Sequence, residues 1–231
     1  MKKKTFIGLV VVLAVVIVVF GFLRNQPIKI NYFKEFIVVD DIQEAKENSK
    51  IIVKGNFESF DKEWNMCRDD NDLSKENSNS QILGKIYNFK INELINGDLD
   101  VKNIKINIEY STRVFYNDNG ILHEKEIVNI DHVNYIDVDS PKYIEPDFDK
   151  EYILYLNYDE FFDLYSSAFQ PYMIEVNNNK LNLLIKNLTQ DTIVFEKKDN
   201  HGRKVIVEQQ HQVVEDFIKG MDINEFRQLN K

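Results

Sequence analysis

Cysteine is almost absent from this chain of 231 residues, which has a single one, Cys67. One cysteine cannot close an intramolecular disulfide, so packing has to supply the stability of the fold. Proline and glycine are also scarce, with 4 and 8 residues, beside many asparagine, lysine and isoleucine residues. This composition is typical of a protein from an AT-rich bacterial genome.

Catalytic sequence motifs are missing too. The chain contains no H-E-x-x-H, G-x-S-x-G, G-x-x-x-x-G-K-[ST] or G-x-G-x-x-G, which mark zinc hydrolases, serine hydrolases and nucleotide-binding proteins. A segment that begins at Asp70 resembles a calcium loop, but Lys75 stands where that loop needs glycine and Gln81 where it needs glutamate. The sequence therefore predicts a protein that is not an enzyme and holds no cofactor.

An excess of positive charge is the third absence. The chain has 29 Lys and Arg against 38 Asp and Glu, a net charge of -9. Four of the basic residues, Lys2, Lys3, Lys4 and Arg24, precede residue 25, so the rest of the chain is more acidic still. Nucleic-acid binding needs a basic surface that releases counterions. This charge balance predicts that neither DNA nor RNA is a partner.

The N-terminus holds the longest uncharged run of the chain, at residues 5–23. Its length is about that of a helix that crosses a membrane. A cleaved signal peptide has a shorter apolar region and a small-residue cleavage site, and residues 21–25 offer no such site. The positive-inside rule places residues 1–4 in the cytoplasm. We expect a single-pass anchor at 5–23 in the cell membrane and an extracytoplasmic domain at 25–231.

Alternating apolar and polar residues predict that this domain is mainly β. Residues 87–91 and 104–110 alternate on either side of Asn96-Gly97-Asp98, which is the pattern of a β-hairpin with a tight turn. Tyr87 and Phe89 are expected to face the core. The continuously apolar segment 151–158 is expected to be a central strand.

Further strands and two helices flank this hairpin. Strands are predicted at 50–60, 172–176 and 180–185, in a hairpin around residues 199–202, and as a pair at 114–116 and 126–130. Asp41 with Glu44, and Asp222 with Glu225, match capping boxes at helix starts. Apolar residues at helical spacing also predict a helix over 213–221. Residues 61–81 are polar and are expected to form a mobile loop.

The succession IIVKGNF, KIYNFKINELINGDL, IKINI and FDKEYILYL resembles the OB-fold of netrin-type modules and of tissue inhibitors of metalloproteinases. The resemblance implies an OB-like β-barrel at 42–156 with an insertion at 111–150, followed by hairpins and helices at 170–231. It implies binding between loops. Those inhibitors chelate the protease zinc through a free N-terminal cysteine. This chain has no cysteine there, so protease inhibition by that route does not transfer.

One segment contains residues that could bind a metal. Asp131, His132, Asp137 and Asp139 lie within nine residues, and converging carboxylates with one imidazole can hold a divalent cation. The alternative interpretation is a solvated loop, because the spacing matches no known ligand pattern. A metal site would make the protein an exported metal-dependent hydrolase, which is the alternative to a binding module.

The segment FFDLYSSAF, residues 161–169, is the candidate partner-binding site. Phe161, Phe162, Tyr165 and Phe169 have a spacing that places them on one side of a short helix. Exposed aromatic residues with a polar rim mark interaction sites, although the same side could be ordinary core. The sequence thus predicts a membrane-tethered, extracytoplasmic binding module with a protein, peptide or glycan partner at the cell surface.

Overall fold

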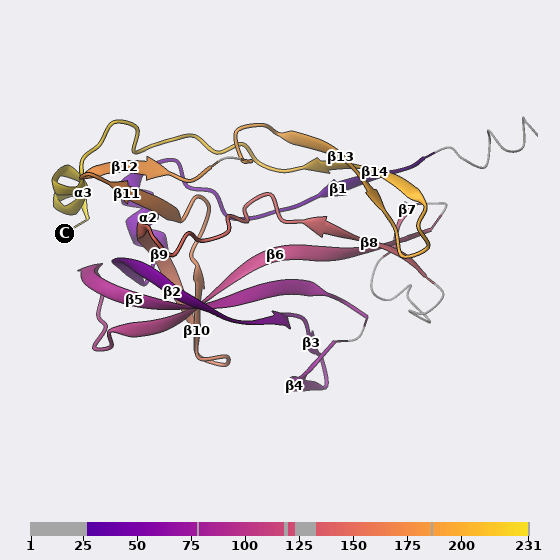
Figure 1. Cartoon of the computed structure of the whole chain (residues 1–231), viewed down its shortest axis with the longest axis horizontal. Coiled ribbons are helices and arrows are strands. Elements are labelled where there is room, and N and C mark those ends of the chain that lie inside the picture. Colours follow the sequence, from indigo (N-terminus) through magenta and orange to yellow (C-terminus); the bar gives the residue numbers. More distant parts are fainter. Residues whose placement is uncertain (1–26, 78, 118–119, 123–132, 186, 231) are drawn as a thin grey trace, which may run out of the picture.

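The computed structural model describes residues 27–77, 79–117, 120–122, 133–185 and 187–230 (Figure 1). The predicted cytoplasmic tail at 1–4 and membrane anchor at 5–23 lie outside these residues. Two helices are described, α2 (Ile42–Asn48) and α3 (Ile223–Leu229), with seven residues each. A membrane-spanning helix needs about 20 residues, and no helix in the described part is long and apolar enough to cross a membrane. The predicted fold class, which included an N-terminal transmembrane helix, is therefore wrong, and its mainly-β part alone is kept.

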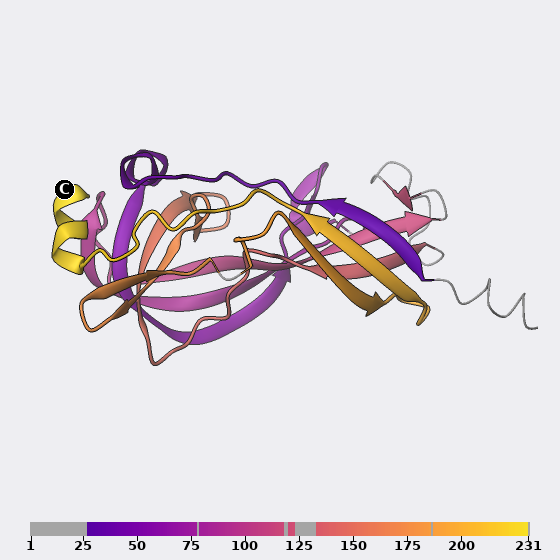
Figure 2. The ribbon, with the colours of Figure 1, turned by 90° about the horizontal axis from the view of Figure 1, so that it is seen from above.

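Strands make up most of the described chain. They are β1 (Ile28–Phe33), β2 (Ile51–Asn65), β3 (Arg68–Asp69), β4 (Asp72–Glu76), β5 (Ile82–Asn96), β6 (Asn103–Asn117), β7 (Gly120–Ile121), β8 (Asn134–Asp139), β9 (Glu151–Asp159), β10 (Leu164–Ser167), β11 (Met173–Asn177), β12 (Lys180–Leu183), β13 (Thr192–Lys198) and β14 (Lys204–Gln210). The two helices lie together at one end of the molecule (Figure 2).

Five strands of the large sheet close into a ring in the order β2-β5-β6-β10-β9, and β9 pairs with β2 again. Neighbours in the ring are antiparallel except β6 and β10, which are parallel. β11 and β12 continue the sheet from β9. The ring forms the lower part of the molecule in Figure 1 and covers most of the region that the sequence predicts to be OB-like.

The main core lies inside this ring. Tyr87 and Phe89 on β5 are fully buried, as the alternation predicted, and Phe89 pairs with Phe57 across β2 with ring centroids 5.0 Å apart. Leu154 lies opposite Val53 on the neighbouring strand, and both are fully buried. The predicted hairpin is confirmed, and so is the central position of β9, which pairs with β2, β10 and β11.

A second sheet has the order β1-β14-β13 and covers the extension of β6 and β8. β1 runs parallel to β14, and the predicted hairpin of β13 and β14 is confirmed. A smaller core fills the space between the two sheets. Its buried members are Ile30, Val114, Tyr116, Ile136, Val138, Val205 and Val207. This core joins the N-terminal and C-terminal strands to the end of β6.

Both predicted capping boxes begin helices. Asp41 Oδ1 accepts a hydrogen bond of 2.8 Å from the Glu44 backbone N–H, and Asp222 Oδ1 accepts one of 3.0 Å from that of Glu225. These side chains satisfy N–H groups that the first helical turn leaves without a partner.

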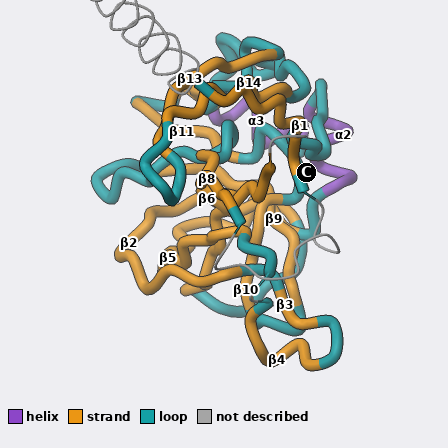
Figure 3. The backbone as a smooth tube through the Cα atoms, turned by 90° about the vertical axis from the view of Figure 1, so that its right-hand side faces the viewer, coloured by secondary structure: helices purple, strands orange, loops and turns teal. Residues whose placement is uncertain are grey.

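Three other expectations need correction. Residues 61–81 are not one loop, because β2 continues to Asn65 and β3 and β4 form a hairpin that projects on the side away from β13 and β14 (Figure 3). Residues 213–221 form no helix, although Val214 and Ile218 are buried. Segment 161–169 is a turn followed by β10 rather than a short helix. The strand expected at 126–130 lies outside the described residues.

Candidate ligand-binding cleft

A cleft opens where β10 separates from β6. The two strands pair at Ile106 and Asn107, and β8 becomes the partner of β6 only from Ser111 onward. Two adjoining pockets of about 190 and 210 Å³ lie beside the residues in between, and they share Met66, Asn107 and Ser166. We call them the polar pocket and the aromatic pocket, and together they form the cleft.

The aromatic pocket is lined by Trp64 from the end of β2 and Phe162 from the turn between β9 and β10. Their rings meet edge to face with centroids 4.9 Å apart. The Arg68 guanidinium lies 4.6 Å from the Trp64 ring centre and 4.9 Å from that of Phe162. These are favourable cation–π distances, so Arg68 helps to hold the two rings in place without lining the pocket itself.

Hydrogen bonds fix the floor that the two pockets share. The Trp64 indole N–H donates to Asn107 Oδ1 at 2.8 Å, and Asn107 Nδ2 donates to Met66 Sδ at 3.5 Å. Gly84 on β5 lies directly beneath, where a Cβ atom would be 2.3 Å from Asn107 Oδ1. Glycine is thus the residue that lets Trp64 and Asn107 meet.

The turn that carries Phe162 is held by its own polar groups. Asp159 Oδ1 accepts hydrogen bonds from the backbone N–H groups of Phe161 and Phe162, at 3.0 and 3.2 Å. The Tyr158 hydroxyl donates to Asp163 at 2.7 Å, and Asp163 has a φ of 53°. Positive φ is tolerated by aspartate in turns. Phe162 is therefore presented from an ordered turn.

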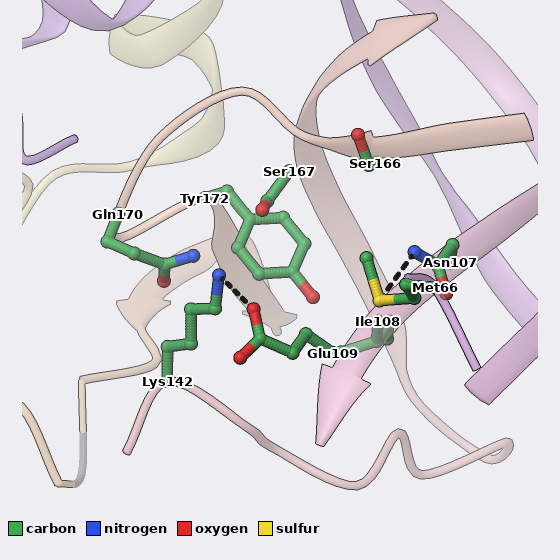
Figure 4. A pocket seen from close by; sticks show the side chains of 9 residues that line it. All are labelled: Met66, Asn107, Ile108, Glu109, Lys142, Ser166, Ser167, Gln170 and Tyr172. Atoms are coloured by element: carbon green, nitrogen blue, oxygen red, sulfur yellow. Dashed lines mark hydrogen bonds and ion pairs between the residues drawn. The ribbon is translucent and has the colours of Figure 1, made fainter. Parts of the chain in front are cut away.

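The polar pocket contains a mostly buried cluster of charged side chains. Glu109 on β6 has a side chain that is 10% exposed. Its Oε1 forms an ion pair with Lys34 Nζ at 2.6 Å and its Oε2 with Lys142 Nζ at 3.0 Å. Burial alone would raise the pKa of Glu109, but the charges of Lys142 and Lys34 together hold that pKa below its ordinary value. Glu109 is therefore ionised at neutral pH, and Figure 4 shows the Lys142 ammonium beside its carboxylate.

Two buried polar side chains point into the same pocket. Gln170 is 3% exposed and Tyr172 is 5% exposed, and both line the cavity (Figure 4). Within the part of the chain that is described, neither the Gln170 amide nor the Tyr172 hydroxyl makes a hydrogen bond. Burial raises the pKa of Tyr172, so its hydroxyl keeps its proton and can donate. Buried polar groups usually have partners, in the protein, in water or in a ligand.

The residues predicted as a metal site lie elsewhere. Asp137 Oδ1 and Oδ2 accept hydrogen bonds from Arg113 at 2.8 and 3.1 Å, and Asp139 accepts one from Lys197 at 2.7 Å. Asp131 and His132 lie outside the described residues. No group of three His, Cys, Asp or Glu that could hold a metal ion occurs in the described part. The four-residue site stays a prediction, and its two described carboxylates are already engaged with cations.

The residues predicted as a partner site are divided by the fold. Phe161 is 59% exposed, and its neighbour Phe162 belongs to the aromatic pocket. Tyr165 is half-buried on β10, where its ring lies 5.0 Å from that of Tyr158. Phe169 is 3% exposed and packs in the core against Tyr155. Of the four predicted residues, Phe162 alone therefore lines the cleft.

Sequence reasoning missed most of the other cleft residues, among them Trp64, Asn107, Glu109, Lys142 and Gln170. The one available signal was that Trp64 is the sole tryptophan of the chain. The cleft combines flat aromatic surfaces with hydroxyl, amide and ammonium donors, which is the composition of a binding site. No protein-family model, curated protein or solved structure matches this chain.

Proposed function

We propose that this protein is a non-catalytic binding module that takes the ring of a small ligand or ligand unit into the aromatic pocket. The observation that carries the proposal is the edge-to-face pairing of Trp64 and Phe162 in a pocket of about 210 Å³ that Asn107 and Ser166 also line. Ligand sites are concave and largely apolar, with a few placed polar groups. The size suits a single sugar or side-chain ring, because drug-sized pockets measure about 300–1,000 Å³.

The position of the pocket supports the same function. OB-fold modules bind oligosaccharides and oligonucleotides through the connections between their first two and their last two strands. In the closed ring, those connections are β2 to β5 and β9 to β10, and they contribute Met66 and Phe162. The net charge of -9 disfavours oligonucleotides. We therefore propose an OB-like closed sheet that binds a saccharide or a peptide.

Trp64 provides a direct test. Because it is the only tryptophan of the chain, intrinsic tryptophan fluorescence reports on the aromatic pocket alone. We expect a panel of methyl glycosides and N-acetylated amino-acid amides to contain compounds that change this emission saturably.

Two variants define the expected result. Phe162→Ala should weaken the binding of an active compound at least about tenfold, because truncating a central aromatic contact removes a large share of the binding energy. Phe148→Ala is the matched control, since Phe148 is another half-exposed phenylalanine, 46% exposed, that lies outside the cleft. Unchanged affinity in Phe162→Ala, or no fluorescence response to any compound, would contradict the proposed function.

A further inference from the structure

The ion cluster at the polar pocket consists of Glu109, Lys142 and Lys34, of which Lys34 lies behind the lining residues, and it carries one positive charge more than its carboxylate can balance. Lys34 and Lys142 both contact Glu109, and their side chains are only 14% and 17% exposed. Asp159 lines the adjoining aromatic pocket and Arg68 contacts its two rings, so these two charges are of opposite sign and do not cancel the surplus. A half-buried surplus charge is costly to hold without a partner, and it stands out in a chain of net charge -9.

The free hydrogen-bonding groups of this pocket converge on the same space. The Lys142 ammonium has three N–H donors, and Glu109 is the partner that the described residues provide for it. The Tyr172 hydroxyl and the Gln170 amide, both more than nine-tenths buried, point into the pocket beside it (Figure 4). An acceptor group in the cavity would satisfy all three at once.

The size of the surplus selects the anion. A carboxylate carries one negative charge and matches a surplus of one, whereas a phosphate monoester carries about 1.5 to 2 at neutral pH and would leave the cluster with excess negative charge. A carboxylate also accepts hydrogen bonds on two oxygens. Lys142 and Tyr172 are donors on two sides of a cavity of about 190 Å³, so one small planar anion can contact both.

We propose that the cleft binds an acidic saccharide unit of the hexuronate class, with the carboxylate in the polar pocket and the sugar ring against Trp64 and Phe162. This proposal rests on the proposed function and names its ligand. The residues shared by the two pockets, Asn107 and Ser166, carry amide and hydroxyl groups that both donate and accept hydrogen bonds. Such groups can hydrogen-bond the hydroxyls of a sugar that lies across both pockets.

The test compares two sugars that differ only at the acidic group. The full chain is titrated with methyl β-D-glucuronide and with methyl β-D-glucoside, by Trp64 fluorescence and by calorimetry. We expect the glucuronide to bind at least about tenfold more tightly, since a hydrogen bond to a charged group contributes more than a neutral one. Lys142→Met should abolish this preference, because it removes the ammonium that contacts the carboxylate, while Lys34 still pairs with Glu109 at 2.6 Å.

Two further variants distinguish the loss of a ligand contact from a general folding defect. Tyr172→Phe removes only the hydroxyl and should lower the glucuronide preference by about threefold or more. Lys150→Met is the matched control, because Lys150 also pairs with a single glutamate, Glu175 at 2.8 Å, but lies outside the cleft. That variant should keep the full preference.

The other possible outcomes refute either the carboxylate site, the saccharide ligand or the proposed function. Equal binding of the two glycosides, or a preference that survives Lys142→Met, refutes the carboxylate site but leaves the proposed function standing. Binding of N-acetylphenylalanine without binding of the glucuronide refutes the saccharide and favours a peptide carboxyl terminus. No response of Trp64 to either sugar or to the amino-acid compounds refutes the acidic saccharide and the proposed function together.

Discussion

Trp64 and Asn107 meet over a residue without a side chain. The indole N–H of Trp64 donates a 2.8 Å hydrogen bond to Asn107 Oδ1, and Gly84 of the intervening strand lies beneath the contact. A Cβ at Gly84 would lie 2.3 Å from Asn107 Oδ1 and 2.8 Å from Trp64 Nε1. The floor of the cleft thus depends on one glycine.

Gly84→Ala should therefore damage the cleft more than the fold. The added methyl group displaces two side chains, and overpacking of this kind costs about 1–3 kcal/mol of the free energy of unfolding. Trp64 emission should shift, and ligand binding should weaken, because the hydrogen bond to Asn107 is lost. Urea unfolding and tryptophan fluorescence measure the two effects.

Gly55→Ala is the comparison for that variant. Its Cβ would lie 1.9 Å from the backbone oxygen of Lys90, and a backbone atom in a paired strand cannot move aside as a side chain can. The loss of unfolding free energy should exceed that of Gly84→Ala. If Gly84→Ala had wild-type stability and unshifted Trp64 emission, the close packing at the cleft floor would be refuted.

Phe89→Ala tests the ring core that the sequence already predicted. Phe89 is fully buried and contacts Phe57 with ring centroids 5.0 Å apart. Truncating such a ring costs about 3–5 kcal/mol of the free energy of unfolding. Phe161→Ala, at a ring that is 59% exposed, should stay within about 0.5 kcal/mol. Equal losses in the two variants, measured by urea unfolding, would contradict this placement of the core.

Local alternation explains why the ring hairpin could be predicted. Residues 87–91 alternate strictly, and every second side chain in that stretch faces the core. β4 gave no such signal, because it has one apolar residue, Leu73. β1 does alternate, with Ile28, Ile30 and Tyr32 facing the smaller core, but it was not predicted from the sequence. The segment 213–221 has helical spacing, but Val214 instead donates its backbone N–H to Leu188 O at 2.8 Å. Tertiary contacts there override helix propensity.

The cleft was less predictable than the fold for a physical reason. Its residues come from four separate segments, and Lys34 meets Glu109 only because β1 and the segment after it run past β6. Nothing local to either residue indicates that contact. Phe162 was within reach of sequence reasoning because it lies in an aromatic segment directly after a buried strand.

The charge cluster of the cleft predicts a pH dependence. The pKa of Glu109 is lower in the folded chain than its ordinary value, so the folded state favours the ionised form. The stabilisation is present above the ordinary glutamate pKa and is lost as the pH falls through the lower, folded-state pKa. Glu109→Gln should therefore reduce the free energy of unfolding at pH 7, and the difference from wild type should shrink below a pH of about 4.

Unfolding of both proteins at pH 7, 5 and 3 measures this dependence. Glu196→Gln is the control, because the Glu196–Lys204 pair is more than half exposed on both sides and such pairs contribute little. A difference between Glu109→Gln and wild type that stays constant with pH would show that Glu109 acts by packing and not by charge.

The second buried acid, Asp199, predicts a loss of stability of its own in acid. Its carboxylate has no exposed side-chain surface and accepts hydrogen bonds from the Tyr116 hydroxyl at 2.6 Å and from Arg203 Nε at 2.8 Å. Burial raises the pKa of Asp199, but these hydrogen bonds together with those from the backbone N–H groups of Arg203 and His201 lower it to about 2. Asp199→Asn should cost about 2 kcal/mol of unfolding free energy at pH 7. Because the folded-state pKa is the lower one, the difference from wild type should disappear between about pH 4 and pH 2.

Tyr116→Phe separates the hydrogen bond of Tyr116 from the charge of Asp199. Burial first, and then the bond to Asp199, raise the pKa of Tyr116 to about 12, so wild type should lose stability as the pH rises from about 10, where the unfolded tyrosine ionises. Tyr116→Phe should not lose the stability that ionisation of Tyr116 costs wild type above about pH 10. It should still lose most of the stability that wild type loses in acid through Asp199, because Arg203 still contacts Asp199. Unfolding free energies from pH 2 to pH 11 measure both limbs. An acid limb that vanishes in Tyr116→Phe would mean that the tyrosine, and not Arg203 with the backbone, holds Asp199 in its ionised form.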